Sequence, residues 1–278
     1  MRVAIEYIQE QVRQALTEDI GTGDVTAQLL PAEQQATASV IAREPGILCG
    51  TQWFEEVFRQ LDSGIHVGWQ AEDADNIEAE QTLCTFSGRT RALLSGERVA
   101  LNFLQTLSGT ATLTSQYVNA MGDTDTHLLD TRKTLPGLRL AQKYAVRCGG
   151  GDNHRIGLYD MILIKENHIT SQGGVTQAMQ AALQHAAGKI DIEIEVENLQ
   201  QLDEALAAGA TRVLLDNFSI ESLRQAVAFT NGRARLEASG NITLENIRAF
   251  AMTGVDYISV GAITKHVQAL DLSMRIHI

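Results

Sequence analysis

The first 110 residues carry the hydrophobic patterns of both helices and strands. Ile5, Ile8, Val12 and Leu16 recur at helical spacing, so the chain is predicted to begin with an amphipathic helix. Three segments that alternate or are rich in β-branched residues predict strands, and a helical stripe lies between the first two. The strands are residues 35–43, 65–70 and 81–88, and the stripe is Trp53, Phe54, Val57, Phe58 and Leu61. These elements predict an α+β sandwich with its aromatic side chains in the core.

A further helix is predicted to begin at Ser95, whose side chain can cap the backbone N–H groups of a first turn. Val99, Leu101 and Leu104 continue its apolar face. Arg98 would then lie in the first turn, where its positive charge opposes the helix dipole. We therefore expect an anionic partner for Arg98 elsewhere, with a solvated arginine as the alternative.

From residue 127 onward, short apolar strands alternate with helical stripes, one pair every 20 to 35 residues or so. This spacing predicts parallel strands with right-handed crossovers. The strands are Leu128–Leu129, Met161–Ile164, Ile190–Val196, Val213–Leu215, the residues around Leu236, and Tyr257–Val260. The helical stripes begin at Pro136, Val175, Leu199, Leu223 and Leu244.

A polar residue stands at the carboxyl end of each of these strands, as in an α/β barrel, whose chemistry lies on that rim. A doubly wound open sheet is the alternative, but it usually binds its ligand at a single switch point. We therefore predict an α/β protein with an N-terminal α+β sandwich domain, residues 1–110, and an α/β barrel catalytic domain, residues 111–266. The C-terminal tail, residues 267–278, can pack back on the first domain.

Composition excludes several classes of protein. With 44% hydrophobic and 20% charged residues, the chain of 278 residues is typical of a soluble globular protein. A net charge of −12 argues against a nucleic-acid partner, and no apolar run reaches the roughly 20 residues of a membrane span. The N-terminus lacks the apolar core of a signal peptide. Three widely spaced cysteines predict reduced thiols and a cytoplasmic location.

One segment, Asp130–His168, reverses the acidic balance of the chain. Arg132 and Lys133 follow one predicted strand and Lys165 follows another, while Gly149–Gly151 begins a turn in which backbone N–H groups can approach a ligand. The full cationic set is Arg132, Lys133, Arg139, Lys143, Arg147, Arg155 and Lys165. A cationic cluster in an anionic protein indicates anion binding, although any single strand-end charge could simply be solvated.

Acidic residues alternate with apolar ones in the strand that ends at Val196. In a barrel these acids would point inward, with Glu195 at the mouth and Asp216 at the matching place one strand later. Two carboxylates on neighbouring strands suit Mg²⁺, with solvated strand-end acids as the alternative. The loop from Glu18 to Asp24 could also hold a metal, but a plain turn is favoured there.

Small residues follow the last two strands, in Glu237–Asn241 and Ser259–Lys265. In barrels, loops at these places bind phosphate through backbone N–H groups. A phosphate-binding loop between a cationic and an acidic half of the rim fits a pyrophosphate-bearing substrate together with a second anionic reactant.

The motifs DTRKT, PGLR, KYAV, GGGDNHRIGL and LIKENH resemble the signature of the quinolinate phosphoribosyltransferase family, decarboxylating enzymes of NAD synthesis. EDIGTGDVT and SGERVALNFLQ extend this resemblance over most of the chain. The resemblance implies an incomplete barrel and a reaction of quinolinate with phosphoribosyl pyrophosphate (PRPP). Its products would be nicotinate mononucleotide, pyrophosphate and carbon dioxide.

The resemblance also implies roles for individual residues. Thr131, Arg132, His154, Arg155 and Lys165 would bind quinolinate, and Lys133 would contact pyrophosphate. Glu195 and Asp216 would serve the ribose and Mg²⁺ directly or through substrate or water. The loops for the 5′-phosphate would be Ser239, Gly240 and Asn241 with Val260, Gly261 and Ala262. Arg98 would come from a neighbouring subunit, which implies a homodimer or higher homo-oligomer with shared sites.

Three other functions remain open. A related phosphoribosyltransferase could use another substrate, although the arginine-rich pocket favours a dicarboxylate. Lys165 could instead form a Schiff base in a barrel aldolase, since cationic neighbours would lower its pKa. A non-catalytic phosphate-binding protein would explain the glycine-containing loops but not the paired acids.

Overall fold

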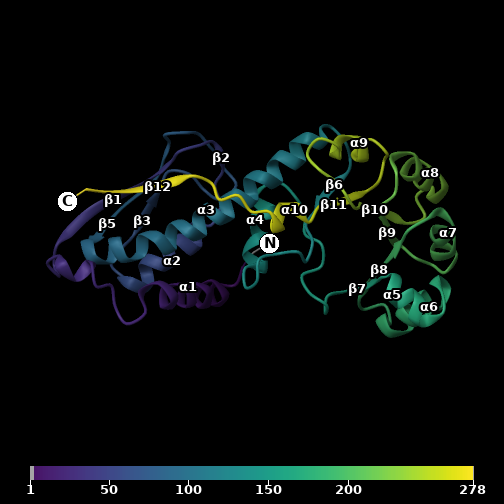
Figure 1. The fold of residues 1–278 in the computed structure, drawn as a ribbon, viewed down its shortest axis with the longest axis horizontal. Coiled ribbons are helices and arrows are strands. Elements are labelled where there is room, and N and C mark those ends of the chain that lie inside the picture. Colours follow the sequence, from purple (N-terminus) through teal and green to yellow (C-terminus); the bar gives the residue numbers. More distant parts are fainter. Residues whose placement is uncertain (1–2, 278) are drawn as a thin grey trace. The chain divides into compact units, whose positions relative to one another are not determined.

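The computed structural model describes residues 3–277, and the chain divides into two compact units (Figure 1). Of the described residues, unit 1 comprises 3–115, 135–150 and 264–277, and unit 2 comprises 116–134 and 151–263. The predicted domain ends at residues 1 and 278 lie outside the described residues. The segment 135–150 belongs to unit 1, whereas the sequence placed it in the barrel domain, because Ala141 and Ala145 are buried in the core of unit 1.

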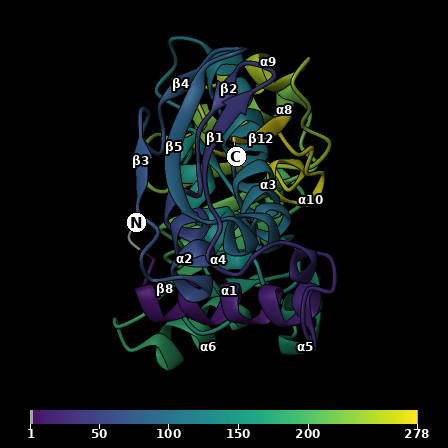
Figure 2. The same cartoon turned by 90° about the vertical axis from the view of Figure 1, so that its left-hand side faces the viewer.

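Unit 1 contains a four-stranded antiparallel sheet in the order β12-β1-β5-β3. Its strands are β1 (Gln35–Ala42), β3 (Val67–Trp69), β5 (Thr82–Arg89) and β12 (Leu272–His277), which Figure 2 shows side by side. Alternate residues of β1, from Ala36 to Ala42, are buried, as the period of a half-covered strand requires. The C-terminal tail is a strand of this sheet, with Met274 opposite Val40. Gly46–Ile47 (β2) and Asn76–Ile77 (β4) form a separate antiparallel pair.

Helices of unit 1 bury the apolar stripes that the sequence predicted. Ile8, Val12 and Leu16 form the buried face of α1 (Ile5–Ile20), and α2 (Thr51–Leu61) buries Trp53 and Phe54. Trp53 Nε1 donates to Gln11 Oε1 at 2.8 Å, so the indole is satisfied within the core, as expected of a structural aromatic residue. Unit 1 also contains a 3₁₀ turn at Ala27–Leu29 and α4 (Arg139–Cys148). Two helices, α3 (Thr90–Met121) and α10 (Ala262–Lys265), each have residues in both units.

The predicted cap at Ser95 is wrong. The helix α3 begins at Thr90, directly after β5, so Ser95 and Arg98 both lie in its interior. Burial of Leu93 favours helix upstream of Ser95 and outweighs the local capping signal. The Ser95 hydroxyl instead donates to Asp24 Oδ2 at 2.7 Å. Arg98 is therefore not in a first turn and does not oppose the helix dipole there.

Pro136 also does not begin a helix. It precedes Gly137, which has φ +78°, and Leu138 N donates to Leu135 O at 3.1 Å. Proline followed by a glycine at positive φ is the pattern of a type II turn, and α4 begins after it, at Arg139.

Unit 2 is built on six parallel strands in the order β6-β11-β10-β9-β8-β7. They are β6 (His127–Leu129), β7 (Met161–Ile164), β8 (Asp191–Val196), β9 (Arg212–Asp216), β10 (Arg235–Ser239) and β11 (Tyr257–Ser259). The helices are α5 (Glu166–Gln172), α6 (Val175–Ala186), α7 (Leu199–Ala207), α8 (Ile220–Thr230) and α9 (Ile247–Ala251). The sequence missed α5, which buries no residue and therefore shows no apolar stripe.

Helices α6 to α9 lie along the outer side of the arc of strands in Figure 1. A doubly wound sheet carries helices on both faces, so the alternative fold is excluded and the α/β barrel is confirmed. Within the described residues β6 and β7 are the two ends of the strand order, so the barrel is incomplete. No helix in residues 3–277 is both long and apolar enough to cross a membrane.

A close backbone contact in unit 1 yields a stability prediction. A Cβ on Gly109 of α3 would lie 2.0 Å from the carbonyl oxygen of Gln268. Gly109→Ala should therefore destabilise the protein by about 1 to 3 kcal/mol, although alanine is normally the better helix former. Gln116→Ala, at an exposed position of the same helix, is the control and should change little. Urea unfolding measures both, and an unchanged Gly109→Ala protein would contradict the contact.

Candidate active site

The carboxyl ends of the parallel strands lie at one edge of the sheet in unit 2, and most predicted site residues belong to this edge. Arg98 is the exception, because it lies in unit 1. The remaining predicted residues are Thr131, Arg132 and Lys133 after β6, His154 and Arg155 in the following turn, Lys165 after β7, Glu195 in β8, Asp216 in β9, Ser239, Gly240 and Asn241 at β10, and Val260, Gly261 and Ala262 after β11.

Two guanidinium groups lie close to each other at this edge. Burial, and then the positive charge of Arg132, lower the pKa of Arg155. The half-buried Arg155 also donates from Nη1 to the carbonyl oxygen of Met161 at 3.3 Å, while Arg132 is exposed. The negative charges of Asp160 and Glu193 act on Arg155 in the opposite direction. Two guanidinium forks at the same edge are suited to bind a carboxylate.

The loops after β6 and β11 are in direct contact. Lys133 N donates to Thr131 Oγ1 at 3.0 Å, which fixes the first loop. A Cβ on Gly261 would lie 2.8 Å from Lys133 Cδ and 3.5 Å from Thr131 Oγ1. Glycine therefore lets the Lys133 side chain lie against the backbone of the loop after β11.

Two carboxylates and two lysines make up the opposite charge cluster. Lys165 Nζ lies 2.5 Å from Glu195 Oε2. Burial first, and then the negative charge of Glu195, raise the pKa of Asp216, while Lys165 and Lys133 act in the opposite direction. Glu195 and Asp216 are thus close enough to repel each other, which is the condition under which a cation binds favourably. Two protein carboxylates fit Mg²⁺ only if substrate or water supplies its other oxygen ligands.

Asn217, which sequence reasoning missed, connects these acids to the predicted phosphate loop. Its backbone lies in the left-handed region, with φ +56°, and its N–H donates to the Ser239 carbonyl at 2.9 Å. Its side chain donates from Nδ2 to Asp216 Oδ2 at 2.7 Å. A Cβ on Gly240 would lie 2.2 Å from Asn217 Oδ1, so only glycine fits there. The available signal was an asparagine directly after a strand, the residue that best tolerates positive φ.

A buried charge cluster lies beneath the site, inside the sheet. Arg212 donates from Nε to Glu193 Oε1 at 2.8 Å and from Nη2 to Glu237 Oε2 at 2.7 Å. Both carboxylates are fully buried. Burial raises the pKa of Glu193, but the hydrogen bond with His154 and the charge of Arg212 outweigh it and lower the pKa overall. Burial and the charge of Glu193 raise the pKa of Glu237 to about 7.

His154 joins this cluster rather than pointing into solvent. Its Nε2 lies 2.8 Å from Glu193 Oε2, and its Nδ1 accepts a hydrogen bond from the backbone N–H of Arg155 at 2.7 Å. Because Nδ1 accepts, the ring proton is on Nε2 and is donated to Glu193. Both ring nitrogens are therefore engaged within the protein, and the predicted contact of His154 with substrate stays a prediction.

The turn that carries His154 and Arg155 is anchored by Asp130, which is fully buried. Asp130 Oδ1 accepts from the backbone N–H of His154 at 2.9 Å, and Oδ2 accepts from Asn153 Nδ2 at 2.7 Å. Asp152 N in turn donates to the Leu128 carbonyl at 2.7 Å. The turn after Gly149–Gly151 is thus held in place by a buried carboxylate and by the backbone after β6.

In unit 1, Arg98 is exposed on α3. The described part of the chain provides no hydrogen bond or ion pair to its guanidinium, so it is available to an external anion. The acidic loop near residue 24 has a structural use: Asp24 Oδ1 accepts from Thr26 N and Ala27 N, both at 2.9 Å, and Oδ2 accepts from Ser95. These hydrogen bonds are typical of a turn, which the sequence favoured over a metal site for this loop.

Comparisons with known proteins agree with the resemblance seen in the motifs. Residues 24–108 match the model for the N-terminal domain of quinolinate phosphoribosyl transferase, and residues 110–275 match the model for its C-terminal domain. The chain is 45% identical over 257 residues to the probable nicotinate-nucleotide pyrophosphorylase (carboxylating) of Bacillus subtilis, covering 92% of this chain and 89% of the relative.

Two further relatives match over nearly their whole length. The nicotinate-nucleotide pyrophosphorylase (carboxylating) of Mycobacterium leprae is 42% identical over 275 residues, covering 96% of each chain. The solved structure of the nicotinate-nucleotide pyrophosphorylase from Francisella tularensis has a TM-score of 0.97 and 50% identity, covering 99% of this chain and 98% of that one.

The buried cluster yields a prediction on pH and stability. The pKa of Glu237 rises from 4.5 to about 7 on folding, so the folded protein keeps a proton that the unfolded chain releases between these pH values. Wild-type stability should fall over this range by at most about 3 kcal/mol, and Glu237→Gln should lack that loss.

The free energy of unfolding of Glu237→Gln, relative to wild type, should therefore increase from pH 5 to pH 8. Urea titrations at both pH values measure it, with the exposed Glu197→Gln as the matched control. A difference between Glu237→Gln and wild type that is the same at both pH values would contradict the raised pKa.

Proposed function

Because the chain belongs to the quinolinate phosphoribosyltransferase family, we propose that it transfers the phosphoribosyl group of PRPP to quinolinate. The products are nicotinate mononucleotide, pyrophosphate and carbon dioxide, a step of NAD biosynthesis. The observation that carries this function is similarity across both domains, over nine tenths of the chain, to proteins named for this reaction. The opposed cationic and acidic clusters at one edge of the sheet support it chemically.

The cationic cluster is suited to bind and orient quinolinate. Arg132 and Arg155 each present a planar fork that matches a carboxylate, and an anion between them relieves their mutual repulsion. Lys165 would exchange its contact with Glu195 for one with substrate. His154 and Thr131 support this pocket, the first through the Arg155 backbone and the second through the backbone of Lys133.

Glu195 and Asp216 act on the ribose. Departure of pyrophosphate leaves an oxocarbenium-like centre at the anomeric carbon, and two carboxylates stabilise that positive charge in the transition state. Lys133 neutralises the departing pyrophosphate. When bound, Mg²⁺ supplies further neutralisation of the pyrophosphate charge, and Glu195 and Asp216 are the residues that would hold it.

No protein nucleophile is required, since the pyridine nitrogen of quinolinate attacks the anomeric carbon. The ring nitrogen becomes quaternary and withdraws electrons from the adjacent ring carbon, which favours loss of the neighbouring carboxylate as carbon dioxide. The protein contributes orientation of the dianion and exclusion of water. The loops at Ser239–Asn241 and Val260–Ala262 bind the 5′-phosphate through backbone N–H groups.

We further propose a homodimer or higher homo-oligomer with shared sites. Arg98 is an exposed cation without a partner in the described residues, so the substrate bound by a second subunit is a suitable anion for it. A cytoplasmic location is supported by three cysteines that form no disulfide in the structure.

The central test is an assay with quinolinate, PRPP and Mg²⁺ that follows release of carbon dioxide. The same assay with nicotinate in place of quinolinate tests the first alternative, because turnover of nicotinate would indicate a related phosphoribosyltransferase. Borohydride trapping with a carbonyl substrate tests the Schiff-base function of Lys165, whose Nζ is paired with a carboxylate rather than surrounded by cations. Binding of PRPP with no turnover of quinolinate would leave a non-catalytic phosphate-binding protein as the remaining alternative function.

Replacing Arg155 by lysine tests the carboxylate pocket. A point charge cannot reproduce the bidentate fork, so Arg155→Lys should weaken quinolinate binding by about 1.5 to 3 kcal/mol and PRPP binding much less. Steady-state KM values and direct titration measure both ligands. Arg224→Lys, exposed on α8, is the control. Equal weakening of the two substrates would remove Arg155 from the quinolinate pocket.

The acids are tested by isosteric amides. Glu195→Gln and Asp216→Asn should each lower kcat by roughly 100-fold or more while quinolinate affinity changes little, because their charge acts mainly in the transition state. Glu197→Gln, exposed just beyond the end of β8, is the matched control and should keep wild-type turnover. Normal kcat in both amide variants would exclude the acids from the mechanism.

Subunit mixing tests the shared site. Arg98→Ala and Arg155→Ala chains should each be inactive, and joint dissociation and reassembly should restore activity to about one quarter of wild type. Random pairing makes about half of the dimers mixed, and each mixed dimer has one intact site of its two. If the mixture remains inactive although chain exchange is verified by mass, Arg98 does not act in a partner's site.

A further inference from the structure

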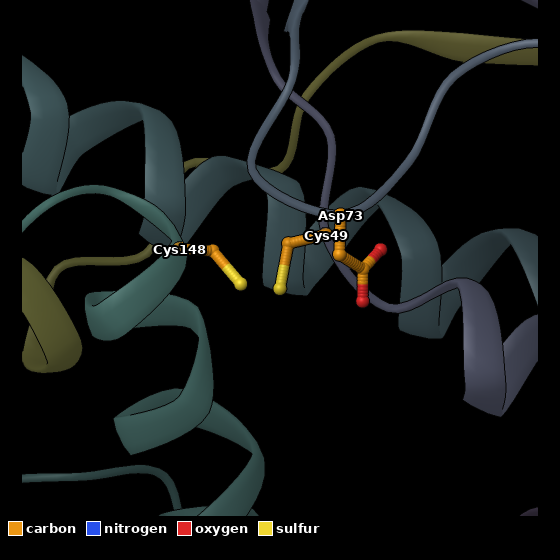
Figure 3. A group of neighbouring side chains, drawn as sticks. All are labelled: Cys49, Asp73 and Cys148. Atoms are coloured by element: carbon orange, nitrogen blue, oxygen red, sulfur yellow. The ribbon is translucent and has the colours of Figure 1, made fainter. Parts of the chain in front are cut away.

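Two of the three cysteines meet in unit 1, although they are far apart in the sequence. Cys49 precedes α2, and Cys148 is the last residue of α4. Figure 3 shows the two sulfur atoms pointing toward each other beside the carboxylate of Asp73. Both sulfurs and an oxygen of this carboxylate lie within 4.8 Å of one another. The third cysteine, Cys84, is buried in β5 and does not belong to this group.

The backbone on each side of the pair is held in place. Cys49 N donates to Ser108 Oγ at 2.9 Å, and the same hydroxyl donates to the Cys49 carbonyl at 3.2 Å. On the other side, a Cβ on Gly149, which follows Cys148, would lie 2.3 Å from the Ala111 carbonyl oxygen, so the end of α4 is packed tightly against α3. Because both backbones are anchored, the sulfurs would close the remaining distance by side-chain rotation.

The two thiols differ in exposure and in acidity. Cys49 has no exposed surface, and burial raises its pKa well above the ordinary value. Cys148 is only half-buried, and the hydrogen bond from Cys49 lowers its pKa. One accessible, more acidic thiol beside a buried one is the arrangement of an attacking cysteine with a resolving cysteine.

We propose that Cys49 and Cys148 form a reversible intramolecular disulfide when the protein is exposed to a peroxide. The proximity of the two sulfurs, which lie within 4.8 Å of each other, and the partial exposure of Cys148 carry this proposal, which does not depend on the function proposed above.

The chemistry takes place in two steps. The Cys148 thiolate attacks one oxygen of hydrogen peroxide, so a sulfur–oxygen bond forms, the oxygen–oxygen bond breaks, and the departing hydroxide takes a proton to become water. The Cys49 sulfur then attacks the resulting sulfenic acid, and its proton leaves with the hydroxyl group as a second water. Two thiols are oxidised and one peroxide is reduced, and a dithiol reductant reverses the change.

Asp73 favours a disulfide over a metal site at these thiols. Its Oδ1 accepts from Gly50 N at 3.0 Å and Thr51 N at 3.1 Å, and its Oδ2 accepts from Tyr144 Oη at 2.8 Å. This carboxylate already holds the start of α2 and the tyrosine, so a metal would have to displace these partners. Its negative charge also opposes the formation of two thiolates at once, which a metal requires and a disulfide does not.

The test uses the full-length protein, exposed to graded hydrogen peroxide and then alkylated under denaturing conditions. A non-reducing digest analysed by mass spectrometry should contain the Cys49 peptide joined to the Cys148 peptide, with Cys84 alkylated. The oxidised protein should also show a higher Tm than the reduced one, because the bond closes a loop of roughly 100 residues in the unfolded chain. Dithiothreitol should reverse both changes.

Single substitutions separate the two roles. Cys49→Ala should leave a sulfenic acid on Cys148 that dimedone traps, Cys148→Ala should leave Cys49 unreacted, and Cys84→Ser should form the disulfide like wild type. Far-UV circular dichroism checks that each variant is folded. If a variant is not folded, the digest of the oxidised wild-type protein alone tests the proposal. Full oxidation of Cys148 without the joined peptide, a disulfide between two chains, or no reaction of Cys148 would each overturn the proposal.

Discussion

Arg212 lies between two fully buried carboxylates, and the geometry of the candidate site depends on that arrangement. An unpaired buried carboxylate would be strongly destabilising, so Glu193 can remain charged inside the sheet only because Arg212 and His154 contact it. Glu193 in turn fixes the ring of His154, and His154 accepts the backbone N–H of Arg155. The position of Arg155 at the site therefore depends on the buried ion pairs that Arg212 makes with the two carboxylates.

The periodic features of this structure could be predicted from the sequence. Six apolar segments between helical stripes specified the parallel strands, and their polar carboxyl ends specified the edge that holds the site. Lys165, Glu195 and Asp216 were correctly placed at strand ends, because alternation in a strand and the parallel direction leave little choice. The aromatic core around Trp53 followed from helical spacing in the same way.

The missed features depend on contacts between distant residues, which no local pattern records. Ser95 has the local signal of a cap, but the burial of Leu93 extends the helix beyond it. Asp130 follows β6 directly and has no local signal of its role, yet it accepts the backbone N–H of His154 and so anchors that turn. Arg212 begins its strand, far from the predicted rim, and its role requires knowledge of two other strands. The order in which the strands pair is set by tertiary contacts, whereas the hydrophobic periodicity can be read from the local sequence.

Each of the two charge clusters at the sheet edge contains a pair of like charges. Burial first, and then the charge of Arg132, lower the pKa of Arg155, and burial first, and then the charge of Glu195, raise the pKa of Asp216. Around the acids the charges are interleaved in part, because Lys165 Nζ lies 2.5 Å from Glu195 Oε2 and Lys133 and Lys165 both lower the pKa of Asp216. A suitable ligand reduces the repulsion within each pair of like charges, an anion at the arginines and a cationic centre at the acids.

The proposed reaction supplies both kinds of relief at once. Quinolinate brings a dianion to the arginines, and the ribose acquires positive charge next to the acids only as pyrophosphate departs. The arginine pair is therefore relieved already in the ground state, whereas the acid pair is relieved most in the transition state. Because only the second kind of relief lowers the barrier, the acidic half is the one that makes the site catalytic rather than merely a binding site.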